Sequence, residues 1–411
     1  MAFSLVGGTV LTPLRTISPG IVVVEGDRIV AVGNENLKTY KGLREVDISG
    51  LYVSPGFIDI HVHGGGGHDV MECSLDALAA IAQTHAKGGT TTWLGTTLTA
   101  PIDQIREALR CIERAMEEEL DGARLLGAHI EGPYFHPAQA GAQNPAYLKR
   151  PIEDNLTELL EGLSCVKRVS AAPELPGGLE LGTELRRRGI LASIGHSNAT
   201  YQEVVKAVEA GYSHVTHIYS GMSTVQRVNA YRFAGVLEAA FLLDDLTTEM
   251  IADGHHLPPS LLRLVIKVKG TDRVCAVTDA IAAAGLGPGK YQVGGLDVIV
   301  EDVMPEEYEL PLGRGNYVAK LADRSAFAGS VATMNQLVKN LVQSADVSLS
   351  QAIKMVTWTP ARILGISGER GLLAPGMKAD LVVFDRDFDV RMTFVEGKLV
   401  YRDTEKKELE H

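Results

Sequence analysis

The central part of the chain alternates short apolar runs with amphipathic segments, and this alternation constrains the fold most. Eight runs have the length and composition of strands that are buried on both faces, as in a parallel sheet. They are Gly56–His61, Thr90–Gly95, Leu125–Glu131, Val166–Ala172, Leu191–His196, His214–His217, Thr248–Ala252 and Val274–Asp279. Segments with the apolar period of a helix lie between them, including Leu75–Lys87, Ile102–Glu119, Tyr201–Ala210 and Pro259–Lys269. Eight such units predict an α/β protein built on a (β/α)8, TIM-like barrel.

Both ends of the chain carry shorter strand patterns. Near the start, two β-branched runs flank the turn Glu25–Arg28, which is a hairpin signal. Near the end, Leu381–Asp385 and Phe394–Tyr401 have the same character. We therefore expect residues 1–54 and 366–408 to form one discontinuous β-sandwich domain, and residues 55–365 to form the barrel.

The stretch 285–327 is rich in glycine, proline and acidic residues. We expect it to be an insertion after the eighth strand, in the form of a hairpin or a lid. Helical patterns resume at Val331–Ser344 and Leu349–Thr357, with Ser330 as the expected N-cap of the first.

The overall charge and composition narrow the class of protein. A formal net charge of -12 argues against non-specific binding to nucleic acid or to an anionic membrane surface. We see no signal-peptide pattern and no apolar run long enough to span a bilayer. The four cysteines are scattered, as is typical of reduced thiols. These features predict a cytoplasmic protein without a nucleic-acid or membrane partner.

Five of the eight strand-like runs end in residue types that bind metals or transfer protons. In a barrel of this kind the chemistry lies at the carboxyl ends of the strands. The residues in question are His61 and His63, Glu131, His196, His217 and Asp279. The two histidines of the first run are two residues apart, so in a strand their side chains point the same way. The joint occurrence of all six residues at strand ends predicts a single metal-dependent active site.

Imidazole and carboxylate ligands suit zinc, with iron or manganese as alternatives. Glu131, His196 and His217 can hold one ion and leave a position for water. His61 and His63 can hold a second ion, with Glu131 bridging the two, so we expect one or two divalent metals.

Asp279 is the natural proton shuttle of such a site. A metal lowers the pKa of its bound water to about 7, and a carboxylate can take the water's proton and pass it to the leaving group. A role for Asp279 as a metal ligand is compatible with this.

Six sequence pieces resemble the amidohydrolase superfamily and, within it, the N-acetylglucosamine-6-phosphate deacetylases. The pieces are Pro55–Gly64, Gly127–Pro133, Ser193–Ser197, Thr216–His217, Ile251–His256 and Thr278–Ala280. The resemblance implies hydrolysis of the acetamide of N-acetylglucosamine-6-phosphate to glucosamine-6-phosphate and acetate, in amino-sugar catabolism. It also implies a homodimer in which one subunit helps to bind its neighbour's substrate.

The resemblance further implies a set of substrate-binding residues, some of which depart from the family's usual pattern. The set is Ala142, Gln143, Ser220, Gly221, Arg227 and His256. Gln143 stands where the family often has a histidine, and Ser220-Gly221 where it usually has Asn-Ala. Arg227 is the best match for the family's phosphate-binding arginine, with Arg232 as a nearby rival.

Other functions remain open at this point. The substrate could be another N-acetylated sugar, such as N-acetylgalactosamine-6-phosphate, or a different N-acyl compound. Cyclic-amide hydrolases are disfavoured, since many carry a carboxylated lysine where this chain has Glu131. The non-enzyme alternative is a sugar-phosphate-binding regulator on the same scaffold. Asp279 argues against it, because a protein that only binds needs no proton shuttle.

Overall fold

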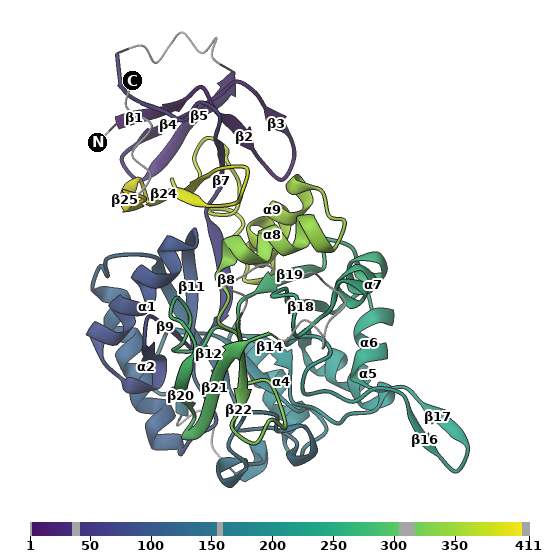
Figure 1. Cartoon of the computed structure of the whole chain (residues 1–411). Helices are drawn as coiled ribbons and strands as arrows, with labels where there is room; N and C mark the ends of the chain where they lie inside the picture. The colour runs from purple at the N-terminus through teal and green to yellow at the C-terminus, as the bar shows by residue number, and fades with distance from the viewer. Residues whose placement is uncertain (1, 35–41, 154–158, 304–316, 405–411) are drawn as a thin grey trace.

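The computed structural model describes residues 2–34, 42–153, 159–303 and 317–404. Its centre is an eight-stranded parallel sheet with the strand order β19-β18-β15-β14-β13-β12-β11-β8 (Figure 1). The strands are β8 (Phe57–Val62), β11 (Thr90–Thr96), β12 (Arg124–Glu131), β13 (Val166–Ala171), β14 (Leu191–Ile194), β15 (Tyr212–Val215), β18 (Thr247–Ile251) and β19 (Val274–Val277). The edge strands β8 and β19 meet through a parallel bridge between Val62 and Ala280. The predicted (β/α)8 barrel is therefore confirmed, with all eight expected strands.

Helices cover the outside of this barrel (Figure 1). They are α1 (Leu75–Lys87), α2 (Ile102–Glu117), α4 (Gly178–Arg187), α5 (Tyr201–Ala210), α6 (Val236–Leu242), α7 (Pro259–Lys269), α8 (Met334–Ser344), α9 (Leu349–Val356) and α10 (Trp358–Ile363). Each buries its apolar face; in α1, for example, Leu78, Ile81 and Ala82 are buried. Within the described part of the chain, no helix is both long and apolar enough to cross a bilayer.

The expectation that Ser330 caps α8 is wrong. The N-cap is Thr333, which forms a capping box with Gln336. The Ser330 hydroxyl instead donates to the Thr278 carbonyl at 2.5 Å, and the residue pairs with Ala280. Ser330 is thus part of the wall that follows β19, because pairing with the barrel satisfies its backbone.

The two ends of the chain combine into a small β-sandwich (Figure 1). A six-stranded sheet, β25-β24-β23-β7-β2-β3, mixes strands from both ends, and a four-stranded sheet, β5-β4-β1-β6, comes from the start alone. These strands are β1 (Ala2–Val6), β2 (Thr9–Leu11), β3 (Thr16–Ile17), β4 (Gly20–Glu25), β5 (Arg28–Asn34), β6 (Arg44–Asp47), β7 (Tyr52–Pro55), β23 (Leu381–Phe384), β24 (Val390–Val395) and β25 (Lys398–Arg402). Leu5, Val22 and Leu381 share one core between the sheets. The domain boundaries stay a prediction.

The segment after β19 contains the antiparallel sheet β20 (Gly289–Val293), β21 (Leu296–Asp302) and β22 (Tyr317–Leu321). Val293 and Val298 pack with Leu98 and Ile281, so this sheet is anchored beside the barrel mouth. Residues 304–316 of the expected insertion lie outside the described residues.

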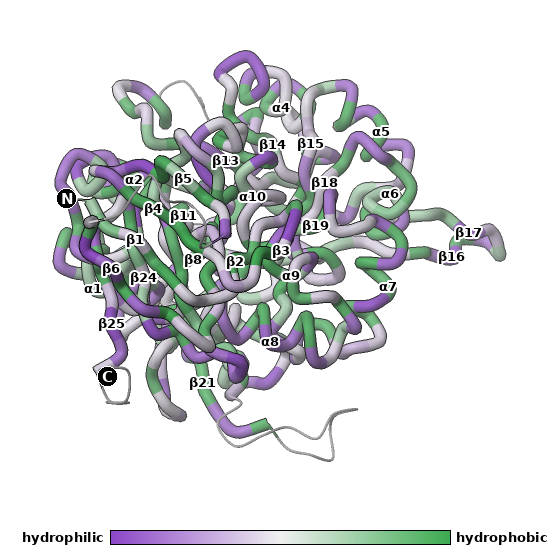
Figure 2. The backbone as a smooth tube through the Cα atoms, turned by 90° about the horizontal axis from the view of Figure 1, so that it is seen from above, coloured by the Kyte–Doolittle hydropathy of each residue, from purple (hydrophilic) through white to green (hydrophobic). Residues whose placement is uncertain are grey.

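A second antiparallel pair, β16 (Gln226–Val228) and β17 (Tyr231–Phe233), is exposed along its whole length. Figures 1 and 2 show it projecting away from the barrel beyond α6.

Candidate active site

All six predicted ligand and shuttle residues lie at the carboxyl ends of the barrel strands. His61 is within β8 and His63 follows it directly, while Glu131 is the last residue of β12. His196, His217 and Asp279 each lie two residues beyond the ends of β14, β15 and β19. All are buried. The structure therefore brings the six predicted residues together at one end of the barrel, and their roles stay a prediction.

Three of these residues have left-handed backbone conformations, with φ of 47° at His196, 24° at His217 and 48° at Asp279. Such a conformation costs about 1–3 kcal/mol at a residue other than glycine and persists only where its surroundings enforce it. At Asp279 the backbone N–H donates to the His61 carbonyl at 3.0 Å. The strained turns direct the side chains to the barrel axis immediately after each strand.

Glu131 is at the centre of the cluster. Its Oε1 lies 3.1 Å from His217 Nε2, 3.5 Å from His196 Nε2 and 3.4 Å from His61 Nε2. Its Oε2 lies 3.1 Å from His63 Nε2. One carboxylate thus faces four imidazoles, as a residue that bridges two cations would.

Asp279 completes a second group. Its Oδ1 lies 3.4 Å from His61 Nε2 and 3.3 Å from His63 Nε2. The ligand atoms of His61, His63 and Asp279 lie within 4.8 Å of one another, as do those of Glu131, His196 and His217. Two candidate metal positions therefore adjoin.

The electrostatics of the cluster favour a cation. Burial lowers the pKa of both His61 and His63, but the carboxylates of Asp279 and Glu131 outweigh it. The pKa of His63 rises to about 9, and that of His61 rises well above its usual value. Excess negative charge in a buried, imidazole-rich site is the setting that a divalent metal stabilises. The residues present therefore fit the predicted metal by donor type and by charge.

A cavity of about 220 Å³ opens onto this cluster. Five predicted substrate-binding residues line it: Ala142, Gln143, Ser220, Gly221 and His256. Its other walls are mainly apolar and come from Leu98, Ile251, Ile281, Val293, Ala326 and Phe327. Sequence reasoning did not assign these apolar residues to the cavity. All but Ile251, the last residue of β18, come from loops and from the segment after β19.

Gln143 has a defined orientation. Its Oε1 accepts from the Thr99 backbone N–H at 2.9 Å, and its Nε2 donates to Glu131 Oε2 at 2.7 Å. An amide nitrogen carries two hydrogens. One N–H is therefore left for a ligand in the cavity that Gln143 lines.

His256 is held by a carboxylate and an aromatic ring. Its Nδ1 donates to Asp253 Oδ2 at 2.8 Å, and its ring lies 4.9 Å from that of Phe327. Burial lowers the pKa of His256, but Asp253 outweighs this and raises it. His256 can therefore present a proton to a ligand.

The structure does not bring Arg227 to the cavity of its own chain. Arg227 on β16 lies directly across from Arg232 on β17, and both are exposed on the projecting hairpin. Among the described residues, no lysine or arginine lines the cavity. A role for either arginine in phosphate binding stays a prediction.

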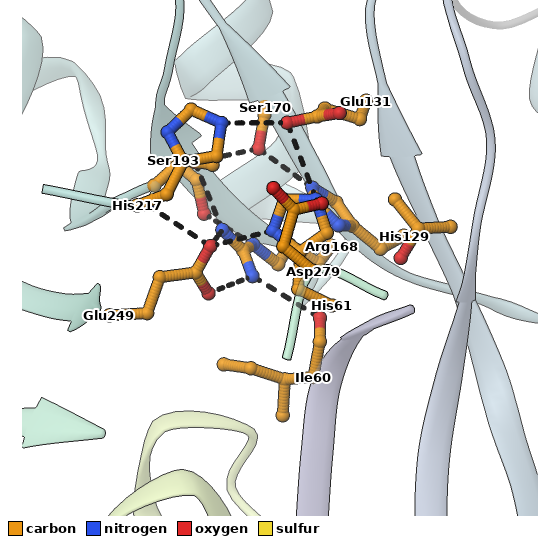
Figure 3. A network of polar contacts seen from close by, with 12 residues as sticks. Ile60, His61, His129, Glu131, Arg168, Ser170, Ser193, His217, Glu249 and Asp279 are labelled. Carbon is orange, nitrogen blue, oxygen red and sulfur yellow. Dashed lines mark hydrogen bonds and ion pairs between the residues drawn. The ribbon is translucent and has the colours of Figure 1, made fainter. Parts of the chain in front are cut away.

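A buried polar network lies beneath the cluster, and sequence reasoning missed it (Figure 3). Arg168 of β13 and Glu249 of β18 form a fully buried ion pair inside the barrel, and Glu249 reaches His61. The available signal was charge within two strand runs, Lys167-Arg168 in the fourth run and Glu249 in the seventh.

Comparisons with known proteins agree with this geometry. Residues 52–400 match the Amidohydrolase family. An N-acetylglucosamine-6-phosphate deacetylase of Vibrio furnissii is 33% identical over 369 residues, which cover 89% of this chain and 88% of the relative. An N-acetylgalactosamine-6-phosphate deacetylase of Escherichia coli O157:H7 is 34% identical over 346 residues, covering 84% and 86%.

A solved structure of a deacetylase is also similar to this chain. A mutant of the N-acetyl-D-glucosamine-6-phosphate deacetylase from Mycobacterium smegmatis, in complex with N-acetyl-D-glucosamine-6-phosphate, superposes with a TM-score of 0.84. It is 31% identical, and the match covers 97% of this chain and 99% of that one.

Proposed function

The chain belongs to the amidohydrolase family, and from this premise we propose that it deacetylates N-acetylglucosamine-6-phosphate. The products are glucosamine-6-phosphate and acetate, and the reaction belongs to amino-sugar catabolism. One observation carries the proposal: five ligand and proton-transfer side chains converge around a sixth, Glu131, and the cavity opens onto this cluster.

We propose that Glu131, His196 and His217 hold one divalent metal and that His61 and His63 help to hold a second. Zinc fits the donor set best, with iron or manganese as alternatives. A metal at this position would lower the pKa of a water molecule to about 7 and polarise a carbonyl group.

The protein's own groups perform the proton transfers. Asp279 takes the proton of the attacking water and delivers it to the amide nitrogen, so that the C–N bond breaks with a neutral amine leaving. The remaining N–H of Gln143 donates to the acetamide oxygen as negative charge develops there. Ala142, Ser220, Gly221 and His256 line the walls against which the sugar is held.

A phosphate on the sugar needs a cation that the described lining does not supply. We propose a homodimer in which Arg227 or Arg232 of the projecting hairpin reaches the partner's cavity. The hairpin's exposure supports this, since Tyr231 is 74% exposed in the single chain. A cytoplasmic location belongs to the same proposal and is supported by the free thiols of all four cysteines.

N-acetylgalactosamine-6-phosphate is the second candidate substrate, favoured by the similarity to the Escherichia coli relative. Acetate release from both 6-phosphates and from both unphosphorylated sugars, with zinc-reconstituted protein, separates the candidates. We expect release from a 6-phosphate, and a rate lower by about 10²–10⁴ from protein carrying Asp279→Asn. Equal release from phosphorylated and unphosphorylated sugars would contradict the role given to the arginines.

A further inference from the structure

The ion pair of Arg168 and Glu249 crosses the interior of the barrel and is fully buried (Figure 3). A guanidinium has five N–H donors, and here all of them have partners. The acceptors are Ser193 Oγ at 3.0 Å, the Ile60 carbonyl at 3.2 Å, Thr216 Oγ1 at 2.9 Å, and Glu249 Oε1 and Oε2 at 2.9 and 2.5 Å. A bidentate pair with every donor satisfied holds the Glu249 carboxylate in one place.

The Glu249 carboxylate also accepts hydrogen bonds from two candidate metal ligands. Glu249 Oε1 accepts from His61 Nδ1 at 2.8 Å and from the His217 backbone N–H at 3.2 Å. An ionised carboxylate can only accept, so the proton of His61 must lie on Nδ1. His61 Nε2 faces the cluster, 3.4 Å from Asp279 Oδ1, and would offer its lone pair to a metal bound there. Such outer contacts fix the tautomer and the ring orientation of metal-binding histidines.

The other ligands depend on different partners. His63 Nδ1 donates to the Thr96 carbonyl at 3.2 Å, and His196 Nδ1 donates to the Gln139 carbonyl at 2.7 Å. Both partners are backbone groups. Among the described contacts of the four histidines, only His61 has a carboxylate as the partner of Nδ1, the ring nitrogen that faces away from the cluster. A change at Glu249 should therefore act unequally on the two halves of the centre.

We propose that Glu249, anchored by Arg168, is a positioning residue that builds the half of the metal centre formed by His61, His63 and Asp279. Among the described contacts, Glu249 meets the half formed by Glu131, His196 and His217 only at the His217 backbone N–H, so its carboxylate does not bond the imidazole rings of that half. The inference rests on the proposed function only in requiring that the cluster bind divalent metal.

The test is a zinc titration of metal-free protein by calorimetry, with bound zinc counted after gel filtration. Wild type should bind two ions. In Glu249→Gln one ion should bind as in wild type and the other should lose about 10–100-fold in affinity. Glu184→Gln is the matched control, because Glu184 pairs with Arg187 and Arg188 at the surface, and it should leave both ions unchanged.

A second variant covers the case in which Glu249→Gln fails to fold. Arg168→Met/Glu249→Met removes both buried charges and should fold, as judged by circular dichroism, while still weakening the binding of one ion and not the other. Two ions bound with wild-type affinity in either folded variant would overturn the inference, and so would equal loss of both ions. A wild-type protein that binds one ion would also overturn it but would leave the deacetylase proposal standing, since acetate release tests that separately.

Discussion

Replacing Gln143 by alanine tests how the cavity stabilises the reaction. The side chain is 4% exposed and doubly held, by the Thr99 N–H and by Glu131, so that its remaining N–H is pre-oriented. Removing one pre-oriented donor from a developing oxyanion costs about 10²–10³ in kcat, or about 2.7–4 kcal/mol. The loss should appear in kcat with little change in KM, because the hydrogen bond strengthens only as charge develops.

The assay is steady-state acetate release from N-acetylglucosamine-6-phosphate at saturating zinc. Gln143→His retains a donor and should recover most of the rate. Gln139→Ala is the matched control: its side chain bonds Asn198 at 3.1 Å and does not line the cavity, while its backbone carbonyl still holds His196. A Gln143→Ala enzyme with unchanged kcat, or with a raised KM alone, would refute the reasoning.

Three further predictions follow from other parts of the molecule. Asp279→Asn should lower kcat by about 10²–10⁴, because the proton shuttle is lost. Substrate binding should stay measurable by calorimetry. Turnover close to wild type would exclude this role of Asp279. Arg227→Ala or Arg232→Ala should raise KM for a 6-phosphate about 10–100-fold, the value of one charge-assisted hydrogen bond, and should leave any activity on the unphosphorylated sugar unchanged; an equal effect on both sugars would place the arginines elsewhere. The third prediction concerns the pH dependence of the contribution that Asp59 makes to stability. Burial raises its pKa from 3.8 to about 7, although its bonds to Thr278 and His61 oppose this. Between about pH 4 and 7 the folded protein therefore keeps a proton on Asp59 that the unfolded chain has lost, so the contribution of Asp59 to stability is largest below pH 4 and decreases as pH rises to 7, by roughly 4 kcal/mol in all. Asp59→Asn should remove this dependence in urea unfolding, and an unchanged pH profile would contradict the assignment.

The positions of the candidate ligands followed from the sequence because strand ends and chemistry coincide in this fold. His61 and His63 are two apart at the end of a strand, and Glu131 ends the third run, so their convergence needed only the barrel topology. The bounds of α1, α5 and α7 agree to the residue with the apolar periodicity. These features depend on local sequence patterns and on one rule of the fold, that functional residues of a barrel lie at the carboxyl ends of its strands.

The features that the sequence did not predict depend on contacts between segments that are distant along the chain. Phe327 reaches the cavity only because the sheet after β19 packs beside the mouth of the barrel. Arg168 and Glu249 are 81 residues apart, and nothing in either strand alone shows that they pair. Ser330 looks like a cap by position but pairs with the barrel wall. Arg227 has the residue type of a phosphate ligand, yet its own chain holds it away from the cavity.

The most direct test of the central claim is acetate release from N-acetylglucosamine-6-phosphate as zinc is added stepwise to the metal-free protein. The account predicts no acetate without metal and a rate that rises with added zinc until the cluster is filled. Folded protein that binds zinc but releases no acetate from this substrate at any zinc level would contradict it.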